Sequence, residues 1–285
     1  MAFGLERIDW KQSWFEGWRE LGLSASERVL VGSQVCEAFN ALRGSQRYLA
    51  SLQLGNAPVG SDTASFSVQF IPQAEAAKDI AYEAFIDANQ QVPTRNNLHD
   101  FFNGLCWLRF PKTKRRLNQL QAQDIAARGI NATRGPLRDA LTLFDENVLL
   151  LQTSDVVWQA LQERQWHTLC VAMRSAWRDT RALIFGHALL EKLVTPYKSI
   201  TAHVYRITSD IDGTDDQALD AWLADHLQPD HLATKPYLPL PVLGIPGWWP
   251  DNEDPEFYQD ARVFRPRTHA LFAATQAGKY PSTDK

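Results

Sequence analysis

Three side chains between residues 187 and 203 have the types that a metal site needs. His187 and Glu191 are four residues apart on an expected helix, so both project from one face of it. His203 lies on the polar side of the next expected strand. Two imidazoles and a carboxylate would bind zinc, manganese or iron and leave one position open for water. In the plainer alternative, His187 bonds to backbone, Glu191 pairs with Lys192 and the third residue fills a half-buried strand position.

A second set of residue types suits acid–base catalysis. It joins one expected helix to the end of another and comprises His99, Asp100, Asn103, Asp145 and Glu146. If the two helices pack antiparallel, His99 becomes a general base that a carboxylate orients. Acids at the C-terminal end of a helix oppose its dipole, so Asp145 and Glu146 need a cation beside them. The alternative is two polar helix surfaces, with Asp100 stabilised by the dipole at a helix start.

A third set is cationic and suits phosphate or another small anion. Four of its members lie near the two sets above in sequence: Arg95, Arg134, Arg138 and Lys192. Arginine offers a planar fork of donors, and an expected helix start after Gly135 offers free backbone amides. No phosphate-loop or dinucleotide glycine motif occurs. For residues 114–116 we expect a solvated helix face.

Hydrophobic patterns place these residues on identifiable elements. Asn97 is expected to cap a helix whose apolar side runs to residue 108, and Pro136 to begin another. A strand that ends at Gly186 is followed by a helix that carries the H-x-x-x-E pair. Residues 199–207 alternate cleanly between apolar and polar positions and predict a strand, and the run VLLL from residue 148 suits a buried one.

The order of elements predicts an α+β fold, predominantly helical around a small mixed sheet. We expect one domain over residues 1–234, because no earlier break is rich enough in proline and glycine to separate domains. From residue 235 prolines interrupt the pattern and deny backbone donors, so residues 235–267 are predicted to form an extended arm that wraps the domain. Residues 268–285 are expected to be a disordered tail.

Composition excludes several classes of protein. The 285 residues carry a formal net charge of −4, which argues against a protein coated in nucleic acid. No apolar run approaches the ~18 residues of a membrane helix, so we expect no membrane contact. Three cysteines without a C-x-x-C pair indicate neither a disulfide framework nor a zinc knot, and favour a cytoplasmic protein.

Charge is strongly segregated along the chain. Residues 95–138 hold nine basic and two acidic side chains, whereas residues 208–260 hold twelve acidic and one basic. Blocks of opposite sign either pair with each other or leave the basic one to face an anionic ligand.

Several long runs of unusual composition resemble one bacterial family. They are NLHDFFNGLCWLRFPKTKRRLNQLQ, RGPLRDALTLFDEN, FGHALLEKL followed by TAHVYRI, and LGIPGWWPDNEDPEFYQDARVFRPR. Together they are similar to the domain of unknown function 3025 family over residues 65–267. Asn147 stands where the family favours glycine, and asparagine also tolerates a left-handed backbone. The resemblance implies no particular activity, cofactor or partner.

Two hypotheses of function follow from the residues. The first is a metal-assisted or His/acid-catalysed hydrolase or lyase that acts on a small anionic substrate, with phosphorylated compounds among the candidates. The second is a non-catalytic adaptor that binds RNA or an acidic protein through residues 95–138. If the charge blocks only neutralise each other, function stays open, and the sequence does not indicate an oligomeric state.

Overall fold

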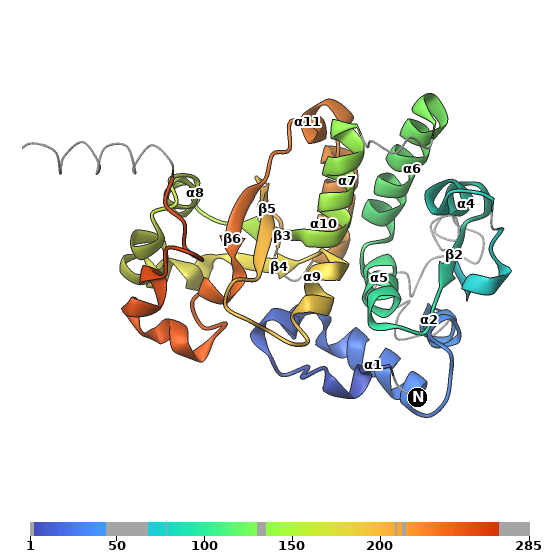
Figure 1. Cartoon of the computed structure of the whole chain (residues 1–285), viewed down its shortest axis with the longest axis horizontal. Helices are drawn as coiled ribbons and strands as arrows, with labels where there is room; N and C mark the ends of the chain where they lie inside the picture. The colour runs from blue at the N-terminus through green and yellow to red at the C-terminus, as the bar shows by residue number, and fades with distance from the viewer. Residues whose placement is uncertain are drawn as a thin grey trace, which may run out of the picture. The chain divides into compact units, whose positions relative to one another are not determined.

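The computed structural model describes residues 3–43, 68–77, 79–129, 135–208, 210–212 and 215–267 (Figure 1). The chain forms two compact units. Unit 1 comprises Met1–Leu149, Leu183–Thr195 and Ser209–Pro236, and unit 2 comprises Leu150–Ala182, Pro196–Thr208 and Tyr237–Lys285. The segment predicted as one domain, residues 1–234, therefore contributes to both units.

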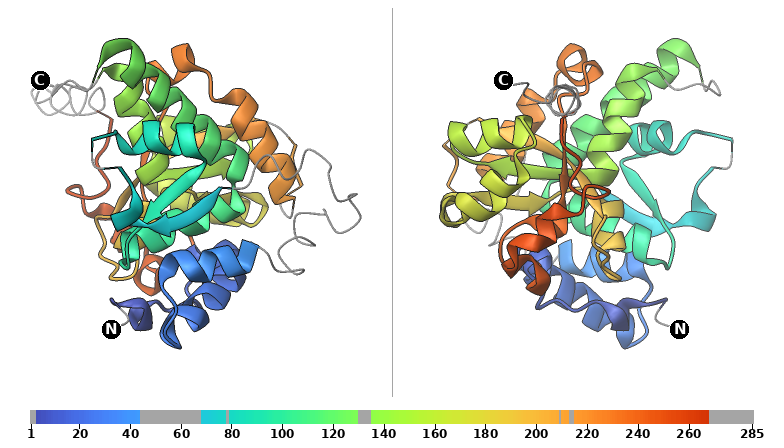
Figure 2. Two further views of the ribbon diagram at one scale, coloured as in Figure 1. Left: turned by 90° about the vertical axis from the view of Figure 1, so that its right-hand side faces the viewer. Right: turned by 60° about the vertical axis from the view of Figure 1, so that its left-hand side comes forward.

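Unit 1 is mainly helical in its described part. Its longer helices are α1 (Arg19–Leu30), α2 (Val35–Arg43), α4 (Tyr82–Asn89), α5 (Leu98–Arg109), α6 (Pro111–Arg128), α7 (Pro136–Asn147) and α10 (Asp216–His226). Two short helices, α9 (His187–Lys192) and α11 (Pro229–Ala233), and the 3-10 helices Leu5–Arg7, Ser13–Trp18 and Gln73–Glu75 complete it. Strands β1 (Gln69–Pro72) and β2 (Gln91–Thr94) pair in parallel and lie side by side in the left view of Figure 2.

Helix α5 is the centre of unit 1 and is buried over most of its length. As expected, Asn97 caps it, and the Asn97 side chain accepts from the Asp100 amide at 2.7 Å. The helix contacts α2, α6 and α9, and Figure 1 shows it with α9 on one side and α2 on the other. Close approach to α2 requires Gly104, because a Cβ there would lie 2.0 Å from the Phe39 ring.

Aromatic side chains fill the core around α5. Trp10, Trp14 and Trp18 are all buried and form part of this packing surface. Regular α-helix begins only at Arg19, because Trp14 and Trp18 lie in a 3-10 helix. The indole of Trp18 donates to the Ile184 carbonyl at 2.8 Å, and so ties this segment to the chain just before α9.

Helix α6 starts at Pro111, and its first amides are satisfied by an acid from α10. Asp220 accepts from the amides of Lys112 at 2.9 Å and Thr113 at 2.8 Å. A buried carboxylate from another helix thus takes the place of a local N-cap residue. Gly129 ends the helix with φ of 79°.

Unit 2 combines strands with short helices. Its described elements are β5 (Thr201–Ile207), β6 (Leu238–Pro241), α8 (Asp155–Gln162), a π-helix (Thr168–Ala172) and the 3-10 helices Arg174–Asp179, Val242–Gly244, Pro250–Glu253 and Pro255–Gln259. Strands β3 (Val148–Gln152) and β4 (Arg181–Ile184) complete a four-stranded sheet of order β4-β3-β5-β6, in which β5 and β6 are antiparallel.

The expected α+β class, dominated by helices around small sheets, is confirmed. The proline-rich segment from residue 237 to 267 forms one strand and short 3-10 helices instead of one long extended stretch. The predicted tail, residues 268–285, lies outside the described residues. None of the helices in the described part of the chain has the length and apolar composition needed to cross a bilayer.

Candidate functional site

Three helices of unit 1 bring the candidate residues together. His99 lies in the first turn of α5, His187 begins α9, Glu191 follows one turn later, and Asp145 lies near the end of α7. Helix α9 approaches α7 closely because Gly186 has no side chain. A Cβ at Gly186 would lie 2.5 Å from the backbone of residue 146.

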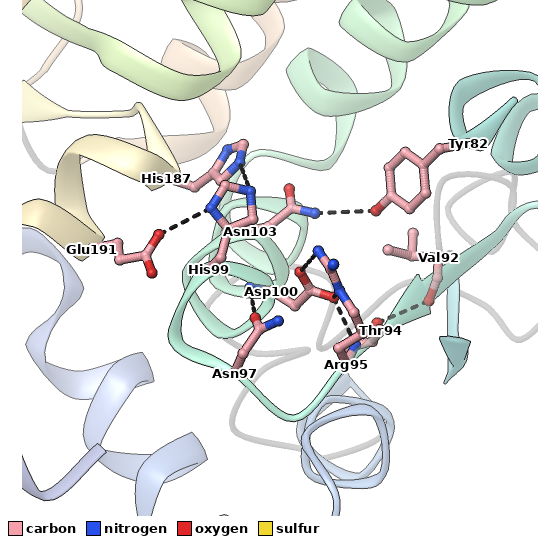
Figure 3. A network of polar contacts seen from close by, with 10 residues as sticks. All are labelled: Tyr82, Val92, Thr94, Arg95, Asn97, His99, Asp100, Asn103, His187 and Glu191. Carbon is pink, nitrogen blue, oxygen red and sulfur yellow. Dashed lines mark hydrogen bonds and ion pairs between the residues drawn. The ribbon is translucent and has the colours of Figure 1, made fainter. Parts of the chain in front are cut away.

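A chain of hydrogen bonds connects these side chains. Glu191 Oε2 lies 3.0 Å from His99 Nδ1, and His99 Nε2 lies 3.1 Å from His187 Nε2. His187 Nδ1 lies 2.7 Å from the carbonyl oxygen of Asp145. Figure 3 shows the carboxylate and the two rings in this order, with the His99 ring between Glu191 and His187.

The hydrogen-bond partner of each imidazole shows which ring nitrogen carries hydrogen. A carbonyl oxygen only accepts, so His187 Nδ1 carries hydrogen and the neutral ring has a bare lone pair at Nε2. A carboxylate also accepts, so His99 Nδ1 carries hydrogen and donates to Glu191. The two Nε2 atoms then face each other. When a proton lies between them on His99, that ring donates from both of its nitrogens.

The network passes from a half-exposed end to a buried one. The side chains of His99 and Glu191 are each 37% exposed, whereas those of His187 and Lys114 are 6% and 4% exposed. Lys114 forms an ion pair with Asp145 and donates to Asn103 Oδ1 at 2.8 Å. Solvent therefore reaches the first histidine, but scarcely reaches the second.

Burial and charge shift two pKa values in this network. Burial lowers the pKa of His187 to about 4, although the Asp145 charge acts to raise it. Burial acts to raise the pKa of Asp145, but the positive charge of Lys114 and the contact with His187 outweigh it, and the pKa falls below its ordinary value. The inner end is thus a neutral imidazole beside an ionised carboxylate.

Asn103 extends the network toward α4. Its Nδ2 donates to the Tyr82 hydroxyl at 3.2 Å (Figure 3). Desolvation raises the pKa of Tyr82 above its ordinary value, so this hydroxyl stays protonated near neutral pH.

The predicted metal set and the predicted acid–base set merge in part. His99 and Asp145 meet through His187, and Glu191 contacts His99. Asp100 instead binds Arg95, accepting from its Nη2 at 2.8 Å and its Nε at 3.0 Å, which gives Asp100 a structural partner.

The predicted metal set draws its residues from both units. His203 belongs to β5 of unit 2, where its ring meets that of Tyr237 edge to face at 6.1 Å. Across the residues that the structure describes, no group of three or more His, Cys, Asp or Glu side chains is arranged to hold a metal ion. The geometry therefore gives no support to a ligand set of His187, Glu191 and His203.

The predicted anion set is only partly assembled. Arg95 is occupied by Asp100, and Lys192 donates to Asn147 Oδ1 at 3.0 Å. Arg138 is half-buried on α7, and its Nε is buried without a hydrogen-bond partner among the described residues. Arg134 lies outside the described residues, and Glu146 is half-buried at the end of α7.

Much of the basic segment is neutralised inside unit 1. Arg109 pairs with Asp216 at 2.7 Å, and Asp220 binds the start of α6. Lys114 was expected on a solvated helix face, which is wrong, because it is 3% exposed and bound to Asp145. These contacts confirm that the two opposite charge blocks pair in part.

A groove between α6 and α10 keeps some of the basic charge accessible. Its volume is ≈ 720 Å³, and its lining includes Lys112, Arg115, Arg116 and Asp225. Arg116 Nε also donates to the Leu227 carbonyl at 3.3 Å, which fixes that side chain along the groove.

Two residues of the site were missed from the sequence. Lys114 had a usable signal: at about 100° per residue it shares a stripe of α6 with Leu117 and Ile125, both buried. Tyr82 had none, since only the packing of α4 against α6 brings it near Asn103.

Comparison with known proteins gives one match. Searches of curated proteins and of solved structures found no match to the chain. A family model described as "Protein of unknown function (DUF3025)" matches residues 68–268. That range covers more than half of the chain and includes the helices that carry both histidines of the network. The chain therefore belongs to the DUF3025 family, as its sequence motifs predict.

Proposed function

We propose that this protein is a hydrolase or lyase that uses His99 and Glu191 for acid–base catalysis on a small anionic substrate. One observation carries the proposal: two half-exposed groups in contact at 3.0 Å form the accessible end of a buried polar network. An acid and a base held together at a solvent-accessible point are what proton-transfer catalysis requires.

The geometry favours Glu191 as the base. Its Oε2 is held by His99, and its Oε1 has no hydrogen-bond partner within the described part of the chain. Glu191 takes a proton at Oε1 from water or from a carbon acid, while His99, carrying hydrogen on both nitrogens as the acid, gives its Nδ1 proton to the leaving group. Return of the proton from Glu191 to His99 Nδ1 then restores both groups.

The inner residues hold His99 in position. His187 is a neutral acceptor for the Nε2 proton of His99, and the Asp145 carbonyl fixes the tautomer of His187. Lys114 neutralises the Asp145 carboxylate, so the buried end carries no net charge of its own.

A cation on α7 supports the choice of an anionic substrate. Arg138 and Asp145 are seven residues apart, which places them on one face of the helix about 10 Å apart along its axis. The buried Nε of Arg138 lacks a partner among the described residues and is a donor that an anionic group would satisfy. Three free, buried cysteines fit the bacterial cytoplasm, where we place the enzyme.

The test is a screen of chromogenic phosphate and carboxylate esters and of carbon acids with a leaving group, in the presence of a chelator. We expect His99→Gln and Glu191→Gln each to lower kcat by about 10²–10⁴-fold. His231→Gln, at an exposed position of α11, is the control and should leave kcat unchanged. Turnover that survives in both site variants would contradict the proposal.

The groove between α6 and α10 favours a second candidate function, binding of RNA. Lys112, Arg115 and Arg116 lie together in its lining. Binding of a single-stranded RNA oligonucleotide should weaken steeply with salt, and the salt dependence should flatten in a variant with Lys112→Glu and Arg115→Glu. Absence of binding at low salt would eliminate this candidate.

A further inference from the structure

The two Nε2 atoms at the centre of the network require an occupant between them. His187 donates from Nδ1 to a carbonyl, and His99 donates from Nδ1 to a carboxylate. Each neutral ring therefore directs its remaining lone pair from Nε2, and these atoms are 3.1 Å apart. Two lone pairs at that distance repel unless a proton or a cation lies between them.

We propose that His99 and His187 bind one divalent transition-metal ion through their Nε2 atoms. Glu191 and the Asp145 carbonyl would then be the partners that orient the two ligands. The site coincides with that of the proposed function, and the ion would take the place of the proton between the two Nε2 atoms. Metal binding is nevertheless measurable without a substrate.

The distances fit a metal ion. Zinc binds histidine nitrogen at ~2.0–2.1 Å in tetrahedral geometry, which puts two ligand nitrogens ~3.3 Å apart. The observed separation is 3.1 Å, and the two rings are inclined at 77° with centroids 4.5 Å apart. Neither ring has to change its partner for the ion to enter.

The surroundings of both rings are typical of metal ligands. A ligating histidine usually donates its other N–H to a carboxylate or a backbone carbonyl, and this network contains one of each. The His187 ring is buried away from solvent, and the Glu191 carboxylate beside His99 adds negative charge that favours a cation.

Two protein ligands leave the ion open to water or substrate. No third His, Cys, Asp or Glu joins the pair within the described part of the chain, so binding should be weaker than at a closed structural site. An open ion is a Lewis acid that would take the anionic group of a substrate directly. This pair of ligands, His99 and His187, differs from the three-residue metal set that the sequence spacing predicts.

The experiment is titration of the full-length, chelator-treated protein with Zn²⁺ at pH 7.5 by calorimetry. We expect one ion per chain, at least 10-fold weaker binding in His99→Gln, and 10–100-fold weaker binding in Glu191→Gln. His203→Gln and His231→Gln are controls with a histidine removed elsewhere, and both should bind as the wild type does.

His99 is the better residue for this test, because it is half-exposed and its replacement removes little packing. Thermal unfolding of each variant establishes that it is folded. Co²⁺ absorption provides a second measurement, since loss of a nitrogen ligand changes the visible spectrum of the bound ion.

The metal site would be overturned by the absence of stoichiometric Zn²⁺ in the wild type, or by unchanged binding in His99→Gln. Loss of binding only in His203→Gln would point to unit 2 instead and also contradicts the pair. The activity screen contains a chelator and therefore measures turnover without a bound metal ion. A negative result in the Zn²⁺ titration would thus not decide the result of that screen.

Discussion

His99 and His187 face each other through their Nε2 atoms at 3.1 Å, although 88 residues separate them in the chain. The contact joins the first turn of α5 to the first residue of α9. It joins the polar surfaces of two helices into one network, which runs from half-exposed Glu191 to the buried pair of Lys114 and Asp145.

Stability should fall on mild acidification because of His187. Its pKa is about 4 in the folded chain and 6.5 ordinarily, so between these pH values the unfolded chain takes up a proton that the folded chain does not. The loss is absent above pH 6.5 and grows toward pH 4, reaching about 3 kcal/mol. Urea unfolding of metal-free protein at pH 7 and pH 4.5 measures it.

Replacement of His187 by glutamine should remove this part of the pH dependence. The pKa of Asp145 is lowered, so its contribution is lost only below its ordinary value of 3.8 and does not overlap. If the free energy of unfolding falls equally in the wild type and in His187→Gln between pH 7 and pH 4.5, the imidazole of His187 is not held neutral.

The ion pair of Lys114 and Asp145 should be costly to break from one side. Lys114→Met leaves a buried carboxylate without its cation, and we expect a loss of about 3–5 kcal/mol in the free energy of unfolding. Lys235→Met breaks an exposed pair with Asp139 and should cost less than about 1 kcal/mol. Equal losses in the two variants would contradict the burial of Lys114.

Gly186→Ala should damage the site without removing any of its side chains. A Cβ there lies 2.5 Å from backbone of residue 146, so α9 must shift away from α7. We expect a loss of about 1–3 kcal/mol in unfolding free energy and weaker Zn²⁺ binding. Gly135→Ala is the matched control, because its nearest heavy atom is 3.4 Å away. Full Zn²⁺ affinity in Gly186→Ala would mean that this approach does not position His187.

Asp220→Ala should destabilise the start of α6. The variant loses an acceptor for two amides and for the Thr113 hydroxyl at 2.7 Å, and we expect a loss of about 2 kcal/mol. Asp225→Ala, an exposed position on the same helix, should change stability by less than about 0.5 kcal/mol. Chemical denaturation of both variants measures the difference, and no difference would contradict the capping role.

Local chemistry explains which parts of the fold the sequence predicts. Asn97 and Pro136 mark helix starts by hydrogen-bonding and φ preference, and both helices begin where expected. The alternating run that becomes β5 is likewise a local signal. The type of helix over residues 13–18 is not a local signal, because Phe15 stacks on Phe102 of α5 and Trp18 donates to the Ile184 carbonyl.

The site was predictable only in pieces. The residue types of His99, Asp145 and His187 were identifiable, but spacing assigned them to two separate sets, whereas the packing of α9 against both α5 and α7 brings them into one network. The partner of His187 is a backbone carbonyl, which no residue type in the sequence indicates. Spacing paired His187 with His203, and tertiary packing pairs it with His99.

The imidazole nitrogens of His99 and His187 give the most direct test of the account. Two-bond ¹⁵N–¹H correlation spectra of the metal-free protein near pH 7, assigned with His99→Gln and His187→Gln, show which ring nitrogens carry hydrogen. We predict hydrogen on Nδ1 of both rings and a bare Nε2 on His187. A bare Nδ1 on either ring would contradict the Glu191–His99–His187 network, and with it both the proposed catalysis and the metal site.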